Sequence, residues 1–154
     1  MMFKTHMAFA LVIAYAAYRF FPDANVFVFT FLILIGAAMP DIDNKRSKIS
    51  QKAKMVSALI NSLTKHRGIF HSVFIPLGIY FLLDMILGGY YGMALALGYL
   101  SHLMIDAMTP LGVNFLHPIT TLRLHGPIET NSFVEKILLA GLVGILFFIG
   151  AQMI

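Results

Sequence analysis

Five long apolar runs, separated by short polar or turn-forming stretches, organise the chain. They cover residues 3–21, 26–39, 69–87, 91–108 and 133–153. Several of them approach the roughly 20 residues that a helix needs to cross the hydrocarbon core of a bilayer. The pattern therefore predicts an all-α, polytopic membrane protein with about five transmembrane helices, in a single domain over residues 1–154.

The segments between these runs predict turns and one longer cap. Residues 22–25 and 88–92 have the composition of tight turns. Residues 109–132 contain polar and turn-forming clusters without sustained periodicity, so we expect a partly structured cap with one re-entrant or surface turn there. Residues 3–21 also resemble a signal peptide, because Ala-Tyr-Ala-Ala is similar to a cleavage site, but His6 favours a retained helix.

Residues 50–65 follow a different pattern. Apolar residues recur at helical spacing from Ile49 to Leu63, and lysines with other polar residues take the opposite face. This stretch predicts an amphipathic helix with a basic face, suited to lie on an anionic membrane surface.

Composition agrees with a membrane protein. Hydrophobic residues make up 59% and charged residues 12% of the chain, against about 45–50% and 25% in soluble domains. The mean hydropathy is +0.84. The absence of cysteine excludes disulfides and thiolate metal sites. Lipids are the expected partners, and nucleic acid is not expected.

Charge predicts the orientation. Seven of the eleven Lys and Arg residues lie between Lys45 and Arg67. The positive-inside rule then places the loop 41–68 in the cytoplasm. With five spans, the N-terminus and residues 109–132 are cytoplasmic and the C-terminus is outside, in a multi-pass protein of the cell inner membrane.

Candidate chemistry begins with His102 and Asp106. The two residues are four apart, so both lie on one face of a helix that the Thr109-Pro110 step ends. An Asp in a membrane helix costs ~3 kcal/mol at mid-bilayer on insertion scales, so the pair needs partners. The predicted topology brings further candidate ligands to the same side of the membrane: His6, Asp41, Asp43, His66 and His71.

These side chains are typical metal ligands. Imidazole nitrogen and carboxylate oxygen bind zinc, and equally manganese or iron. Seven candidates exceed the needs of one ion and suit two divalent metals about 3.5–4 Å apart, bridged by a carboxylate. Arg67, next to His66, could neutralise a phosphate group.

Three motifs carry a resemblance to a known family. Pro-Asp-Ile-Asp, His-Arg-Gly-x-x-His-Ser and Gly-Tyr-x-Ser-His-x-x-x-Asp-x-x-Thr-Pro-x-Gly-Val occur in this order. Together they resemble the YdjM-like family of inner-membrane-associated proteins, some of which are named for control by the LexA repressor. The resemblance covers most of the chain, from His6 to about Pro118. One departure is Phe70, where the family often has a small threonine, and it concerns the shape of the pocket.

The resemblance implies a metal-dependent hydrolase. The family's motif layout is similar to that of helical zinc-dependent phospholipase C-type enzymes, which implies phosphodiesterase or phosphatase chemistry. The implied metal ligands are His6, Asp41, Asp43, His66, His71, His102 and Asp106. The residues expected to act in catalysis are Asp41, Asp43, Arg67, His71 and Asp106.

Two functions compete at this point. The first is hydrolysis of a phosphoester, on a lipid or lipid-linked substrate, at the cytoplasmic membrane face. The second is a non-enzymatic role as a metal transporter or as a metal-stabilised structural factor, in which His102 and Asp106 pin two helices. A transporter needs ionisable residues part-way across the bilayer in several spans, so the gathering of ligands at one face favours the enzyme. His117 and His125 are expected to be loop residues or substrate contacts.

The predicted orientation can be tested with reporter fusions. A fusion after residue 48 and a fusion at the C-terminus should report opposite sides of the membrane, because an odd number of spans separates that loop from the C-terminus. Reporters on the same side would show that the number of spans is wrong.

Overall fold

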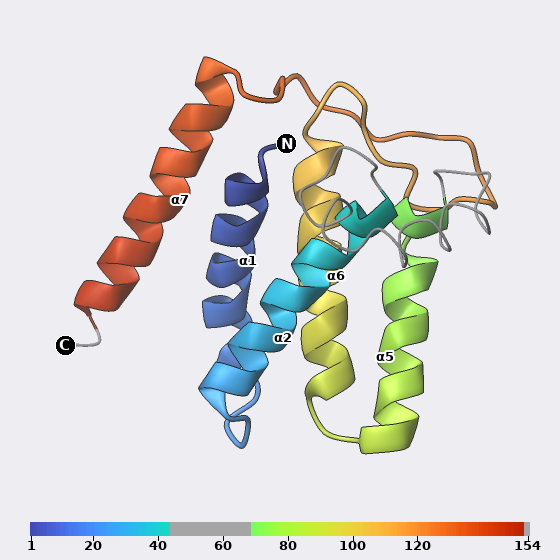
Figure 1. The fold of residues 1–154 in the computed structure, drawn as a ribbon, viewed down its shortest axis with the longest axis vertical. Coiled ribbons are helices and arrows are strands. Elements are labelled where there is room, and N and C mark those ends of the chain that lie inside the picture. Colours follow the sequence, from blue (N-terminus) through green and yellow to red (C-terminus); the bar gives the residue numbers. More distant parts are fainter. Residues whose placement is uncertain (44–68, 153–154) are drawn as a thin grey trace.

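The computed structural model describes residues 1–43 and 69–152 (Figure 1). In these residues the chain forms five α-helices and no named strand: α1 (Phe3–Tyr18), α2 (Val26–Ala38), α5 (Phe74–Leu87), α6 (Tyr91–Ala107) and α7 (Phe133–Ala151). Two short 3-10 helices, η1 (Met39–Asp43) and η2 (Ile69–His71), flank the part that is not described. The all-helical class is confirmed for the described residues. The predicted basic helix 50–65 lies outside them.

Each predicted apolar run contains one helix, and local signals explain most of the ends. The side chain of Asn25 caps α2 by accepting from the backbone N–H groups of Phe27 and Val28, at 3.0 and 3.2 Å. Gly88 and Gly89 make the turn before α6 with φ values of 63° and 66°, which residues with a Cβ rarely adopt. Between α6 and α7 the chain is irregular, apart from one antiparallel bridge between Val113 and Leu124 in the described residues.

The prediction for the third run was wrong at its start. The sequence predicts a span from residue 69, but α5 begins at Phe74. Pro76 explains the difference, because a proline is tolerated in the first turn of a helix and breaks a helix in its interior. The preceding backbone bonds elsewhere instead, since Val73 donates its N–H to the Phe115 carbonyl at 2.8 Å. His71 therefore lies on a turn at the helix entrance.

Helix α6 is central and packs against α1, α2 and α5. Glycine permits the closest approach. A Cβ on Gly36 of α2 would collide with the Leu95 carbonyl of α6, and a Cβ on Gly98 of α6 would collide with the Ile33 carbonyl of α2. Small residues at such crossings bring helix backbones together, a packing mode typical of membrane helices. The backbone of α2 consequently lies directly against the face of α6 that carries His102.

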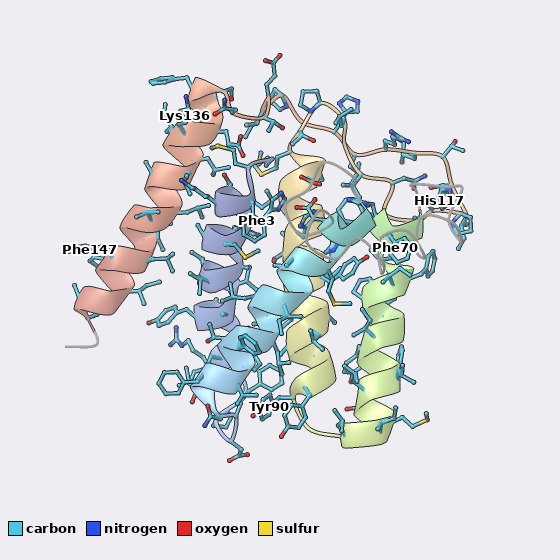
Figure 2. All side chains as sticks on the ribbon, viewed as in Figure 1. Phe3, Phe70, Tyr90, His117, Lys136 and Phe147 are labelled. Carbon is cyan, nitrogen blue, oxygen red and sulfur yellow. The ribbon has the colours of Figure 1, made fainter. Side chains whose placement is uncertain are left out.

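The helices differ in length and exposure. Among the described residues only α7, with 19 residues and a length of about 28 Å, is long and apolar enough to cross a membrane by itself. Helices α2 and α5 are apolar but shorter. Large apolar side chains nevertheless face outward, such as Phe27 at 82%, Phe81 at 65% and Phe147 at 79% exposure. Figure 2 shows Phe147 pointing away from the other helices.

Successive helices of the bundle run in alternating directions, and α2 and α7 are inclined to the others (Figure 1). The start of α1, the end of α2, the start of α5, the end of α6 and the start of α7 lie at one end of the molecule. The start of α1 and the end of α6 are thereby brought together at that end.

Replacement of Gly98 by alanine should destabilise the fold. The added methyl group has no room against α2, and overpacking of this kind costs about 1–3 kcal/mol. The matched control is Gly141→Ala on α7, where a Cβ meets no atom of the described residues within 4 Å. Unfolding in detergent micelles by SDS titration measures both. Equal stability of the two variants would contradict the close α2–α6 packing.

Candidate metal centre

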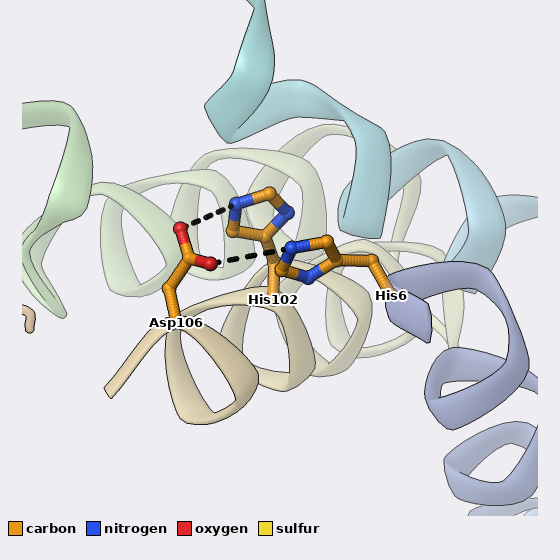
Figure 3. A group of neighbouring side chains, drawn as sticks. All are labelled: His6, His102 and Asp106. Carbon is orange, nitrogen blue, oxygen red and sulfur yellow. Dashed lines mark ion pairs between the residues drawn. The ribbon is translucent and has the colours of Figure 1, made fainter. Parts of the chain in front are cut away.

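His6, His102 and Asp106 converge at the end of the bundle where α1 begins and α6 ends (Figure 3). His6 lies in the first turn of α1, and the other two residues lie one turn apart near the end of α6. One possible ligand atom from each residue can be chosen so that the three atoms all lie within 4.8 Å of one another. Because α1 and α6 run in opposite directions, two distant segments of the chain supply one site.

Asp106 is the hub of this cluster. Its Oδ1 lies 3.3 Å from His6 Nε2, and its Oδ2 lies 3.3 Å from His102 Nε2 (Figure 3). The N-terminal ammonium of Met1 also contacts Oδ1, at 3.0 Å. The rings of His6 and His102 are stacked, with centroids 4.0 Å apart and planes 10° apart. These close partners of the carboxylate, within residues 1–43 and 69–152, are all nitrogens, and the carboxylate attracts positive charge.

One hydrogen bond determines how His102 presents its second nitrogen. Nδ1 lies 2.7 Å from the carbonyl oxygen of Ala37, in the last turn of α2. A carbonyl only accepts, so Nδ1 carries a proton. In a neutral ring Nε2 then has a lone pair, and that lone pair is directed at the carboxylate of Asp106. Two acceptors at 3.3 Å repel each other unless a cation or a second proton lies between them.

The donor set suits a metal ion. A metal-bound histidine ordinarily donates its other ring N–H to a carbonyl or carboxylate, which sets the tautomer and the ring orientation. His102 and Ala37 have this arrangement. Zinc–ligand bonds of about 2.0–2.1 Å at tetrahedral angles separate neighbouring ligand atoms by about 3.4 Å. The two nitrogen–oxygen separations of 3.3 Å are close to that value, although each involves a different oxygen of Asp106.

The side chains of this cluster differ in their exposure to solvent. The side chains of His6 and His102 are 2% and 0% exposed, whereas those of Asp106 and His71 are 20% and 23% exposed. His71 Nε2 lies 3.9 Å from Asp106 Oδ2, so the two partly exposed side chains are neighbours. Catalytic metal sites keep one position open to water or substrate, whereas structural sites are closed.

The other predicted residues are placed less directly. Asp41 is half-buried in η1, which packs against α6 and η2 and therefore lies at the same end of the bundle. His66, Arg67 and the side chain of Asp43 lie outside the described residues. His125 is exposed in the segment between α6 and α7, as expected for a loop residue.

The chain can now be compared with known proteins. The sequence model of a family described as YdjM inner membrane protein matches residues 1–154. The chain belongs to the YdjM family.

Two relatives of this YdjM-family chain have the following similarity. The uncharacterized protein YvsG of Bacillus subtilis (strain 168) is 35% identical over 111 residues, which make up 70% of this chain and 69% of YvsG. The inner membrane protein YdjM of Escherichia coli (strain K12) is 36% identical over 97 residues, which cover 55% of this chain and 46% of that relative. The chain thus matches less than half the length of the E. coli protein. No solved structure matches the chain.

Sequence reasoning missed Glu135, which lies near the cluster in the first turn of α7. Its side chain is fully buried and accepts hydrogen bonds from Met2, Thr5 and Asn131. The available signal was Ser132-Phe-Val-Glu135, which matches the capping box of a helix start. That motif predicts the local hydrogen bond of the serine but gives no sign of the contact with α1.

Removal of any one ligand should empty the centre. We expect His6→Ala, His102→Ala and Asp106→Ala each to lose most of the zinc bound by the purified YdjM-family protein, because two remaining donors hold the ion weakly. His125→Ala is the control and should keep the wild-type zinc content. The measurement is metal analysis by mass spectrometry after dialysis. Full zinc retention in His102→Ala would show that these side chains do not share an ion.

Proposed function

We propose that this YdjM-family protein is a membrane-bound, metal-dependent hydrolase that acts on a phosphoester at the cytoplasmic face of the inner membrane. The observation that carries the proposal is the lone pair of His102 Nε2, directed at Asp106 in a cluster that also contains His6 and that borders the partly exposed His71. The substrate class follows from the resemblance of the motifs and from the position of the site at one end of the bundle.

The proposed membrane arrangement is five spans with the N-terminus in the cytoplasm. The outward-facing apolar side chains of α2, α5 and α7 support it, because lipid would cover them. At about 20 Å, α2 and α5 are shorter than a typical bilayer core of ~30 Å, so local thinning of the bilayer accompanies this arrangement. The family description as an inner membrane protein supports the location.

The donor set fits zinc best, and manganese or iron as alternatives. His6, His102 and Asp106 would hold one ion, and Asp41 and His71 at the same end could contribute to a second. A bound divalent ion supplies a Lewis acid for a phosphoryl oxygen and an acidified water. Asp106 holds the ligand cluster together, and the Ala37 carbonyl fixes the tautomer of His102.

His71 is suited to a proton-transfer role. It lies on the η2 turn and is partly exposed, within 3.9 Å of the Asp106 carboxylate. If the site holds one ion and His71 is not a ligand, an imidazole there can bind the leaving oxygen of a substrate and give it a proton. Helix α6 fixes the backbone of η2, because the Tyr99 hydroxyl of α6 donates a hydrogen bond to the Phe70 carbonyl of η2 at 2.5 Å. Arg67, four residues before His71 in the sequence, is proposed to offset the charge of a phosphate group.

A structural role is the second candidate, and one observation favours it. The contacts of His102 with Ala37 and of His6 with Asp106 join α1, α2 and α6 at one point. A metal there would stabilise the bundle even without turnover. The two candidates differ in what Asp106→Asn does: an enzyme loses its reaction, whereas a structural factor loses only stability.

Metal-loaded protein in liposomes should cleave a phosphoester, and Asp106→Asn should reduce turnover at least about 100-fold. Mutation of a residue that only hydrogen-bonds to a metal ligand typically lowers metal affinity or activity by about 10–100-fold. Asp106 would bind the metal directly, and the neutral amide of asparagine is a weaker ligand than a carboxylate. The substrates to test are phosphatidate, phosphatidylglycerol, p-nitrophenyl phosphate and its bis ester, assayed by phosphate or nitrophenol release. His125→Ala is the matched control.

Two results would contradict the hydrolase proposal. One is the absence of cleavage across this panel by protein with a full complement of zinc or manganese. The other is equal turnover in the wild type and in Asp106→Asn, which would assign the activity to a contaminant.

A further inference from the structure

Glu135 is a buried carboxylate that links two helices. It lies in the first turn of α7, and its side chain is 0% exposed. Oε2 accepts from the backbone N–H of Asn131 at 2.5 Å. Oε1 accepts from the backbone N–H of Met2 at 2.6 Å and from the Thr5 hydroxyl at 3.0 Å. Both oxygens are therefore used, one within the α7 start and one on α1.

The two oxygens have different purposes. Ser132 caps α7 by accepting from the Glu135 N–H at 3.2 Å, and Oε2 completes the cap by returning to Asn131. Oε1 is left for another helix. Met2 is the N-cap residue of α1, and a methionine side chain has no oxygen with which to cap a helix. Glu135 accepts instead from the N–H of Met2 itself and from the Thr5 hydroxyl, and its negative charge lies at the positive ends of both helices.

This contact reaches His6 through the backbone. The N–H of His6 donates to the Met2 carbonyl at 3.3 Å, and the N–H of Met2 donates to Glu135. Thr5, the other donor to Glu135, directly precedes His6. The first turn of a helix has few internal hydrogen bonds and frays most readily, so an external acceptor there restricts the position of the residues it carries.

We propose that Glu135 is a positioning residue for His6. By holding the first turn of α1 against the start of α7, it directs His6 Nε2 toward Asp106 and prepares the metal centre before an ion binds. The inference rests on the metal binding contained in the proposed function, and it adds a part for α7, which the predicted ligand set does not include.

The test is Co²⁺ titration of the full-length protein in detergent, read from the visible absorption of the bound ion. Glu135→Ala should raise the Kd for Co²⁺ about tenfold and alter the absorption bands, because a less fixed His6 is a poorer ligand; about tenfold is the low end of the effect of losing a group bonded directly to a ligand. Thr5→Val, which removes one donor without changing side-chain shape, should raise the Kd about threefold. Glu135→Gln keeps one oxygen for Met2 and Thr5 but turns its NH2 group toward the Asn131 N–H, so its Kd should rise less than that of Glu135→Ala.

Leu142→Ala is the matched control, since Leu142 is the other buried residue of α7. It weakens the packing of α7 and leaves the Glu135 hydrogen bonds in place, so its Kd should stay within about twofold of the wild type. If Leu142→Ala weakens Co²⁺ binding as much as Glu135→Ala does, general docking of α7 explains the effect and the inference is wrong. If Glu135→Ala does not fold, Thr5→Val decides in its place.

The remaining outcomes separate this inference from the proposed function. Wild-type protein that binds no Co²⁺ overturns the metal centre itself. Wild-type protein that binds Co²⁺, with loss of binding in His102→Ala and unchanged Kd and spectrum in both Glu135→Ala and Thr5→Val, overturns only the role of Glu135.

Discussion

The hydrogen bond between His102 Nδ1 and the Ala37 carbonyl, at 2.7 Å, connects the packing of the bundle with its chemistry. It requires the end of α2 to lie directly on α6, and Gly36 and Gly98 permit this approach because neither carries a Cβ. It also assigns the proton of the ring, so that Nε2 is left to face Asp106. A buried pair of acceptors at that distance is costly unless positive charge neutralises it. A metal ion bound at this point would neutralise the pair, and the N-terminal ammonium of Met1 contacts Oδ1 of the same carboxylate at 3.0 Å.

The position of this point follows from the up-and-down bundle. His6, His102 and Asp106 lie near helix ends. In the proposed five-span arrangement these ends would lie at the membrane interface, where the cost of a charged group is lower than at mid-bilayer. Helix α7 adds Glu135, a second carboxylate at the same end, which is fully buried and bonds to backbone and hydroxyl donors. The two carboxylates therefore have different partners: one faces imidazoles and the other caps helices.

Much of this could be predicted from residue spacing. The interval of four between His102 and Asp106 places them on one helix face, and the predicted topology places His6 on the same side. In the structure His6 Nε2 lies 3.3 Å from Asp106 Oδ1. The start of α5 was predicted too early, because hydropathy does not register the effect of Pro76 on the turn before it. Glu135 was missed because a capping box is a local signal, whereas its second oxygen acts on a helix 130 residues away. Asp43, His66 and Arg67 remain predictions.

X-ray absorption at the zinc K-edge of the metal-loaded protein tests most directly whether the His6, His102 and Asp106 cluster binds a metal. The account predicts nitrogen and oxygen ligands at about 2.0–2.1 Å, with the outer-shell scattering of at least two imidazoles. In His102→Ala the imidazole scattering should fall by one ring for whatever zinc remains bound. A spectrum with oxygen ligands alone, or one that His102→Ala leaves unchanged, would contradict the account.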